Sequence, residues 1–308
     1  MNLLALLIGL VVERLATQLF HLRELRWLDR VIDAGFSQVV RFGNWPALIP
    51  VILLAVLLVA PVYLIWFSLG DALYGFPYLL LAIIVLFFSL GPNDIGEDVN
   101  EYCKALETGD EDRVNLTAKA LIEADVPASA AERTRQVEGA VCIQANNRLF
   151  AVIFWFVVLG PVAAWAYRVT DLMRRRTVFN ASRNSSAIAA HETVSGDPVL
   201  SAASNLHGWF AWVPARLTAV GYGLAGSFDG AKAAWRAPAE SKVLSHSEQS
   251  EHLLARVGTG ALALSRAEGE TDVERAIRGA TSANGMVFRL LFIWAAVIAI
   301  MTLYGWSV

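Results

Sequence analysis

The chain has few charged residues. Asp, Glu, Lys and Arg together make up 17% of its 308 residues, whereas globular proteins usually carry about a quarter. The net charge of −3 leaves no basic excess, so no nucleic-acid-binding surface is expected. Only two cysteines are present, Cys103 and Cys142, which is too few for a disulfide framework. Hydrophobic residues make up 56% of the chain, and this balance favours a membrane protein.

Common catalytic motifs are absent as well. The glycines and lysine between Gly226 and Lys232 do not have P-loop spacing, and no nucleophile elbow is present. His246 and His252 are six residues apart, and neither they nor the cysteines show the spacing of metal ligands. The residues themselves therefore predict no cofactor and no metal site.

Long apolar runs are what the chain has instead. Three runs of about 20 residues each match a hydrocarbon core of roughly 30 Å in helical form. The N-terminal segment is a fourth candidate, because it is apolar up to Val12 and then carries Glu13 and Arg14. No strand pattern occurs. The sequence thus predicts an all-α polytopic membrane protein, one domain over 1–308, with four full transmembrane helices at 1–20, 46–68, 72–91 and 286–306.

Two further apolar segments are interrupted. Gly160-Pro161 breaks 149–167, and Pro214 with Arg216 interrupts 209–228. Arginines flank the first segment on both sides, which conflicts with the positive-inside rule for a single crossing. Each segment is therefore either a full span or a re-entrant piece, and broken backbone at membrane depth requires protein or a water-filled cavity around it.

The polar regions that remain are expected to be helical and cytoplasmic, because they carry the Lys and Arg residues. The first region is 93–148, with helices expected near 94–107, 110–124 and 128–148. The second is 229–285, with helices expected near 245–266 and 271–282. Turn residues such as Gly109 and Pro127 separate the expected helices.

Polar residues in or beside the apolar segments are the candidates for function, because placing them near the hydrocarbon core costs free energy. Arg135, Glu138 and Asn146 fall on one helical stripe that ends at the membrane surface. Such a stripe either faces a ligand at the mouth of a membrane cavity or is a solvated face with an ion pair. Arg168 and Arg216 lie in or beside apolar runs, where an arginine either binds an anion or snorkels to the interface.

Several strings resemble the CobD/CbiB superfamily of cobalamin biosynthesis. They are Glu138 followed by Asn146-Asn147-Arg148-Leu149-Phe150, then Gly160-Pro161, Ala166-Tyr167-Arg168 and Val213-Pro214-Ala215-Arg216-Leu217. Within that group the chain is most similar to the AmpE family. That similarity is carried by Glu13-Arg14-Leu15, Gly91-Pro92, Gln144-Ala145-Asn146-Asn147-Arg148-Leu149-Phe150-Ala151 and Gly226-Ser227-Phe228-Asp229-Gly230.

The AmpE resemblance implies a multi-pass protein of the bacterial inner membrane that modulates β-lactamase induction and cell-wall recycling signals. It implies an AmpD-type amidase as partner, besides the lipid bilayer, and a muropeptide or other anionic small molecule as ligand. The ligand pocket would be lined by Arg135, Glu138, Asn146, Asn147, Arg168 and Arg216.

Two polar motifs of the cobinamide synthetases are missing. Their Gly-Arg-Asp-Thr string is replaced by 121–125, and their Asn-Thr-Leu-Asp-Ser-Met string by 169–173. The resemblance therefore implies a non-catalytic protein with a repurposed pocket. The alternative is an ATP-dependent amide synthetase, which would need ATP and Mg²⁺. A third possibility, a transporter, rests only on the broken helices.

Overall fold

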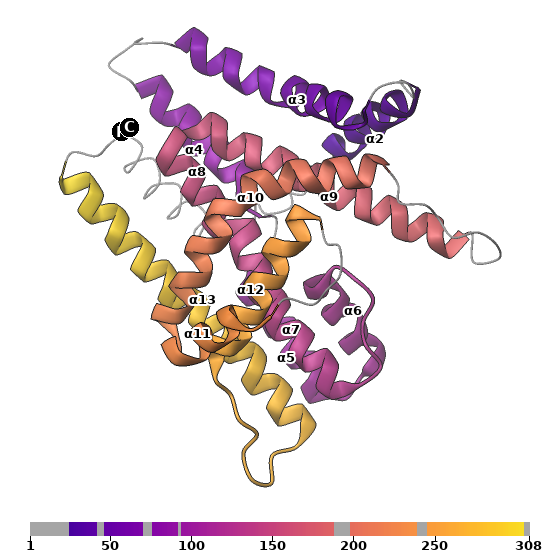
Figure 1. The fold of residues 1–308 in the computed structure, drawn as a ribbon, viewed down its shortest axis with the longest axis vertical. Coiled ribbons are helices and arrows are strands. Elements are labelled where there is room, and N and C mark those ends of the chain that lie inside the picture. The colour runs from indigo at the N-terminus through magenta and orange to yellow at the C-terminus, as the bar shows by residue number, and fades with distance from the viewer. Residues whose placement is uncertain are drawn as a thin grey trace.

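The computed structural model describes residues 25–41, 46–69, 76–91, 94–187, 198–238 and 245–304. The predicted first span, 1–20, lies outside them. The described residues are helical, with turns and short loops between helices and no strands (Figure 1). The helices are α2 (Arg26–Arg41), α3 (Leu48–Leu69), α4 (Phe76–Ser89), α5 (Ile95–Thr108), α6 (Glu111–Ile122), α7 (Ala130–Ala145), the π-helix η3 (Asn146–Phe150), α8 (Ala151–Leu159), α9 (Pro161–Ala187), α10 (Pro198–Ala225), α11 (Phe228–Arg236), α12 (His246–Leu262) and α13 (Asp272–Leu303).

Three of the described helices are long and apolar enough to cross a membrane: Leu48–Leu69, Ala130–Leu159 and Asp272–Met301. The first and third overlap the predicted spans 46–68 and 286–306. The middle one, formed by α7, η3 and α8 without a break, was expected to be a polar helix followed by a broken segment. In the predicted span 72–91, α4 has only 14 residues. The all-α membrane architecture is confirmed, while the count of four spans is not.

Apolar side chains are exposed on the outer surfaces of α3, α10 and the second half of α13. On α3, Leu53 is 61% exposed, and on the second half of α13, Phe292 is 75% exposed. The outer face of α10 carries exposed Trp209, Leu217 and Leu224. Surfaces of this kind are stable only in contact with lipid or another apolar partner. In Figure 1 the polar helices α5 and α6, together with α11, lie in the half of the molecule away from α3.

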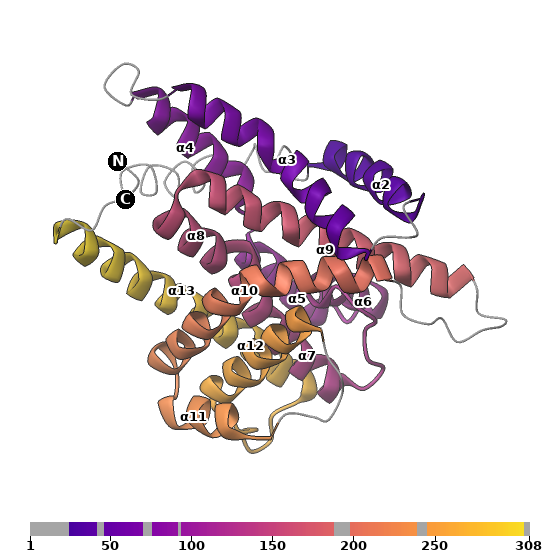
Figure 2. The same cartoon turned by 45° about the horizontal axis from the view of Figure 1, so that its top comes forward.

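The segment 149–167 breaks where its sequence predicts. Helix α8 ends at Leu159, Gly160 takes a φ of 82°, and Pro161 opens α9 in the position that best tolerates its missing N–H group. The two helices then pack against each other (Figure 2). The break at Gly160-Pro161 is therefore confirmed, while the choice between a re-entrant piece and a full span stays open.

The predicted interruption of 209–228 at Pro214 does not occur. Helix α10 continues through Pro214 and ends only at Ala225. A proline inside a helix leaves the carbonyl four residues earlier without its usual N–H donor. Here the indole Nε1 of Trp155 donates to that carbonyl, the backbone oxygen of Phe210, over 3.1 Å. A side chain from α8 thus satisfies the backbone group that the proline leaves free.

Candidate functional site

The candidate site begins at the π-helical turn between α7 and α8. Wider π turns are rare and occur often at functional sites. Three consecutive polar side chains in this turn, Asn146, Asn147 and Arg148, are buried. Gly91 permits the close approach of Arg148, because a Cβ at position 91 would lie 2.7 Å from the Arg148 Cβ. The backbone N–H of Gly91 also donates to the Arg148 carbonyl over 3.2 Å.

The centre of the site is the fully buried carboxylate of Asp171 on α9. Its Oδ2 accepts hydrogen bonds from Arg168 Nη1 and Arg175 Nε, each over 2.9 Å. Its Oδ1 accepts a longer one, 3.5 Å, from Arg174 Nη2. The four residues share one face of α9 because they are spaced by three or four positions. One carboxylate therefore organises three guanidinium groups.

A second carboxylate, Glu123, joins this centre to the π-helical turn. Glu123 ends α6 with a positive φ of 57° and forms ion pairs with Arg175 and, over 3.4 Å, with Arg148 Nη2. Arg148 also binds Asp98 on α5 over 2.8 Å. Gln144 Oε1 accepts hydrogen bonds from Arg148 and Arg175, each over 3.0 Å. Helices α5, α6, α7 and α9 thus meet in one set of charge-assisted hydrogen bonds.

Neutral groups extend the network toward α10 and α12. The Asn147 side chain donates to Glu251 over 3.3 Å and accepts from Tyr167 and Asn146 over 3.3 and 3.0 Å. His207 lies 3.4 Å from the Tyr167 hydroxyl through Nε2 and 2.9 Å from Ser247 Oγ through Nδ1. Each of these side chains has a polar partner, which offsets the cost of its burial.

The network is electrically balanced. Its ion pairs join four arginines to four carboxylates: Arg148, Arg168, Arg174 and Arg175 with Asp98, Glu123, Asp171 and Glu251. Burial alone would raise the pKa of Asp171, but the guanidinium groups around it hold that pKa well below its usual range. Burial raises the pKa of Glu251, although Arg174 opposes the shift. Charges this deep are tolerated only because they are paired.

The network is closed inside and open at one edge. Asp171 and His207 are fully buried, whereas the Glu123 side chain is 29% exposed and those of Arg175 and Glu251 are each 19% exposed. At the centre, the Nε–H groups of Arg168 and Arg174 have no hydrogen-bond partner among the residues that the structure describes. The arrangement therefore presents arginines to an approaching anion and keeps unused donors behind them.

The structure brings three of the six predicted site residues into this network: Asn146, Asn147 and Arg168. Arg135 is exposed and lies about 16 Å along the helix axis from Asn146, outside the network. Glu138 pairs instead with Arg275 of α13. Arg216 stacks over the Trp212 ring on the outer face of α10, 4.0 Å from the ring centroid, as a snorkelling arginine does.

The network also contains six residues that were not predicted from the sequence: Asp171, Arg174, Arg175, Glu123, His207 and Glu251. A signal was present for the first three. Asp171 stands with an arginine three residues before it and arginines three and four residues after it, which places all of them on one helical face. Glu123, His207 and Glu251 come from other helices, and no local pattern indicates that they meet α9.

A family model described as "Regulatory signalling modulator protein AmpE" matches residues 1–308. The chain belongs to the AmpE family. A curated relative of this AmpE-family chain is the "Cobalamin biosynthesis protein CobD" of Stutzerimonas stutzeri (strain A1501), with 25% identity over 161 residues. The match covers 52% of the chain and 49% of the relative, so the chain spans about half the length of that protein. No solved structure matches. The AmpE assignment and its relation to CobD agree with the resemblance seen in the sequence.

Proposed function

We propose that this AmpE-family protein modulates β-lactamase induction and cell-wall recycling signals from the bacterial inner membrane, without catalysing a reaction. The proposal rests on the family match over the whole chain and on the buried arginine network. A network with its own carboxylates, a solvent edge and unused guanidinium donors is suited to bind an anion reversibly. The ligand we propose is a muropeptide or a similar anionic small molecule.

Binding proceeds by exchange of carboxylates. In the structure Glu251 forms an ion pair with Arg174 over 3.1 Å, and Glu123 forms one with Arg175. Both glutamates stand at the exposed edge, and a ligand carboxylate would take the place of one of them. The exchange keeps the buried charge balanced, so the cost of leaving a guanidinium unpaired is avoided. It also frees a glutamate on α12 or at the end of α6, which gives the bound state a different surface.

The proposal is tested by deleting the gene in its native host and measuring β-lactamase activity after exposure to a β-lactam below the inhibitory concentration. We expect deletion to change the induction ratio and the wild-type gene to restore it. Arg174→Gln should fail to restore it, whereas Arg113→Gln, which alters an exposed arginine on α6, should succeed. Each variant is compared at equal abundance in the membrane fraction.

Two outcomes contradict the proposal. One is an unchanged induction ratio in the deletion strain. The other is full restoration by Arg174→Gln at normal abundance, which would separate the function from the network. An AmpD-type amidase, the partner we propose, should also co-purify with the tagged protein after cross-linking. If no such complex is found in wild-type cells, the amidase is not the partner.

The alternative function is an ATP-dependent amide synthetase, and the match to the CobD relative is consistent with it. Purified protein would then hydrolyse ATP in the presence of Mg²⁺ and a carboxylate substrate. The variant Glu138→Gln tests whether Glu138, one of the residues that carry the resemblance to the synthetases, is needed for this activity. Glu138 pairs with Arg275 outside the arginine network, so its loss leaves that network intact. ATP turnover that Glu138→Gln abolishes would establish this alternative and overturn the non-catalytic proposal.

A further inference from the structure

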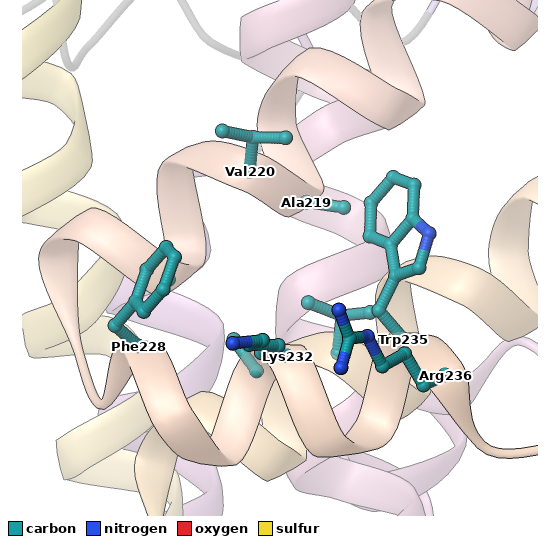
Figure 3. A pocket seen from close by; sticks show the side chains of 9 residues that line it. Ala219, Val220, Phe228, Lys232, Trp235 and Arg236 are labelled. Atoms are coloured by element: carbon teal, nitrogen blue, oxygen red, sulfur yellow. The ribbon is translucent and has the colours of Figure 1, made fainter.

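A groove separate from the arginine network runs between α10 and α11. Its volume is about 190 Å³, and its walls include Val220 and Gly223 of α10. The α11 wall carries Phe228, Lys232, Trp235 and Arg236, which recur at helical spacing and so share one face. In Figure 3, Phe228 and Trp235 stand at the two ends of the groove and Lys232 lies between them. Apolar walls with cations among them form an amphipathic binding surface.

The groove is held in shape by close contact between glycines. A Cβ at Gly230 would lie 2.1 Å from the backbone oxygen of Gly260, and one at Gly260 would lie 2.7 Å from the Cβ of Ala234. The Ser227 N–H also donates to the Ala261 carbonyl over 2.7 Å. These contacts fix α11 on α12 and leave its other face toward α10. The groove is therefore built into the fold.

The two cations of the groove have no ion-pair partner within the part of the chain that the structure describes. Both Lys232 and Arg236 are exposed, and Asp229, the acidic residue of α11, forms an ion pair with neither of them among the described residues. A cation in the last turn complements the helix dipole, which accounts for Arg236 but not for Lys232 or the aromatic walls. The groove thus offers two exposed positive charges beside apolar surface.

The groove is also continuous with the apolar outer face of α10. Val220, which lines it, is 53% exposed, and Leu217 and Leu224 lie one turn away on the same face. An acyl chain lying along this face would reach the groove without leaving apolar surroundings. At the groove its headgroup would meet Lys232 and Arg236. Basic side chains beside a membrane attract anionic lipids, and an amphipathic helix such as α11 lies naturally at the interface.

We propose that the α10–α11 groove binds an anionic phospholipid of the surrounding bilayer, with its phosphate on Lys232 and Arg236 and an acyl chain against Phe228, Trp235 and Val220. Charge complementarity selects the headgroup, and continuity with the lipid-facing surface of α10 selects a membrane lipid as its source. The site serves to fix α11 at the leaflet on the side of the polar helices. It is independent of the function proposed for the arginine network.

The test is native mass spectrometry of the purified full-length protein in a zwitterionic detergent. Phosphatidylglycerol is titrated beside phosphatidylcholine with the same acyl chains. We expect wild-type protein to retain phosphatidylglycerol preferentially, and Lys232→Gln with Arg236→Gln to weaken its binding about thirty-fold. The control removes the same charge from exposed positions of α6, with Arg113→Gln and Lys119→Gln, and should leave the binding unchanged.

A second variant tests the apolar half of the site. Val220→Trp fills the groove from its exposed side and keeps both cations, so it should also weaken phosphatidylglycerol binding. Glycerol phosphate, which lacks acyl chains, should not compete. The proposal is overturned if both lipids bind equally, if the α6 control loses as much binding as the groove variant, or if glycerol phosphate competes fully. It is equally overturned if Val220→Trp releases a second copy of the chain or a bound protein, because the groove would then be a protein interface.

Discussion

Replacing Asp171 with asparagine should destabilise the protein strongly, because this carboxylate neutralises the centre of the arginine network. The substitution keeps the size of the side chain and removes one negative charge from a fully buried position. Arg168 and Arg175 then lose the negatively charged partner that each contacts over 2.9 Å. Breaking a buried pair by removing one partner costs about 3–5 kcal/mol. For a chain of this size that corresponds to a fall in the unfolding midpoint of about 10 °C.

The assay is thermal unfolding of the purified protein in one detergent, and Asp125→Asn, at an exposed loop position, is the control. A double-mutant cycle isolates the pair: Asp171→Asn, Arg168→Gln and the two combined. If the charges act as one balanced unit, the double variant should be more stable than the sum of the single losses predicts, by at least about 1 kcal/mol. Strict additivity, or a loss for Asp171→Asn no larger than that for Asp125→Asn, would refute the reasoning.

Two further predictions concern pH and packing. Burial, together with Arg174, lowers the pKa of His207 to about 3. An unfolded histidine has a pKa near 6.5, so folding keeps His207 neutral at a pH where the unfolded chain would protonate it. The stability from this effect is complete above about pH 6.5 and falls by roughly 2 kcal/mol by pH 5. Unfolding midpoints at pH 7.5 and 5.0 should therefore differ more for wild type than for His207→Gln, and equal differences would contradict the assignment. Gly230→Ala should lower stability by about 1–3 kcal/mol because its new methyl group meets the backbone of α12. Gly285→Ala, with nothing within 4 Å, should be neutral or stabilising in the same denaturation assay, and the reverse order would be inconsistent with the glycine contact.

The helices were predictable where the sequence carries strong local signals. Caps explain the success in the polar regions: Asp94, Asp110 and Ser245 precede α5, α6 and α12, and each accepts from the backbone of the first turn. The apolar runs likewise predicted α3 and the second half of α13. The continuity of α10 through Pro214 was not predictable, because it depends on Trp155 from another helix.

The site was harder to predict than the helices because its residues are distant in sequence. Asn147 and Glu251 are 104 positions apart and meet only when α12 packs beside the π-helical turn. Arg135, Glu138 and Asn146 were expected to form one stripe on a single helix. In the structure they lie at different heights of that helix and have different neighbours. Helical spacing identifies which side chains share a face, but only the packing of α9, α10 and α12 decides which face is buried and charged.

Direct binding of a muropeptide to the purified protein, measured by calorimetric titration, tests the central claim most directly. The account predicts binding by wild-type protein, loss of binding by Arg174→Gln and stronger binding by Glu251→Gln, which removes the internal carboxylate that competes with the ligand for Arg174. Arg113→Gln should bind as wild type does. Absence of binding, or equal affinity in all four proteins, would contradict the claim that the buried arginine network is the ligand site.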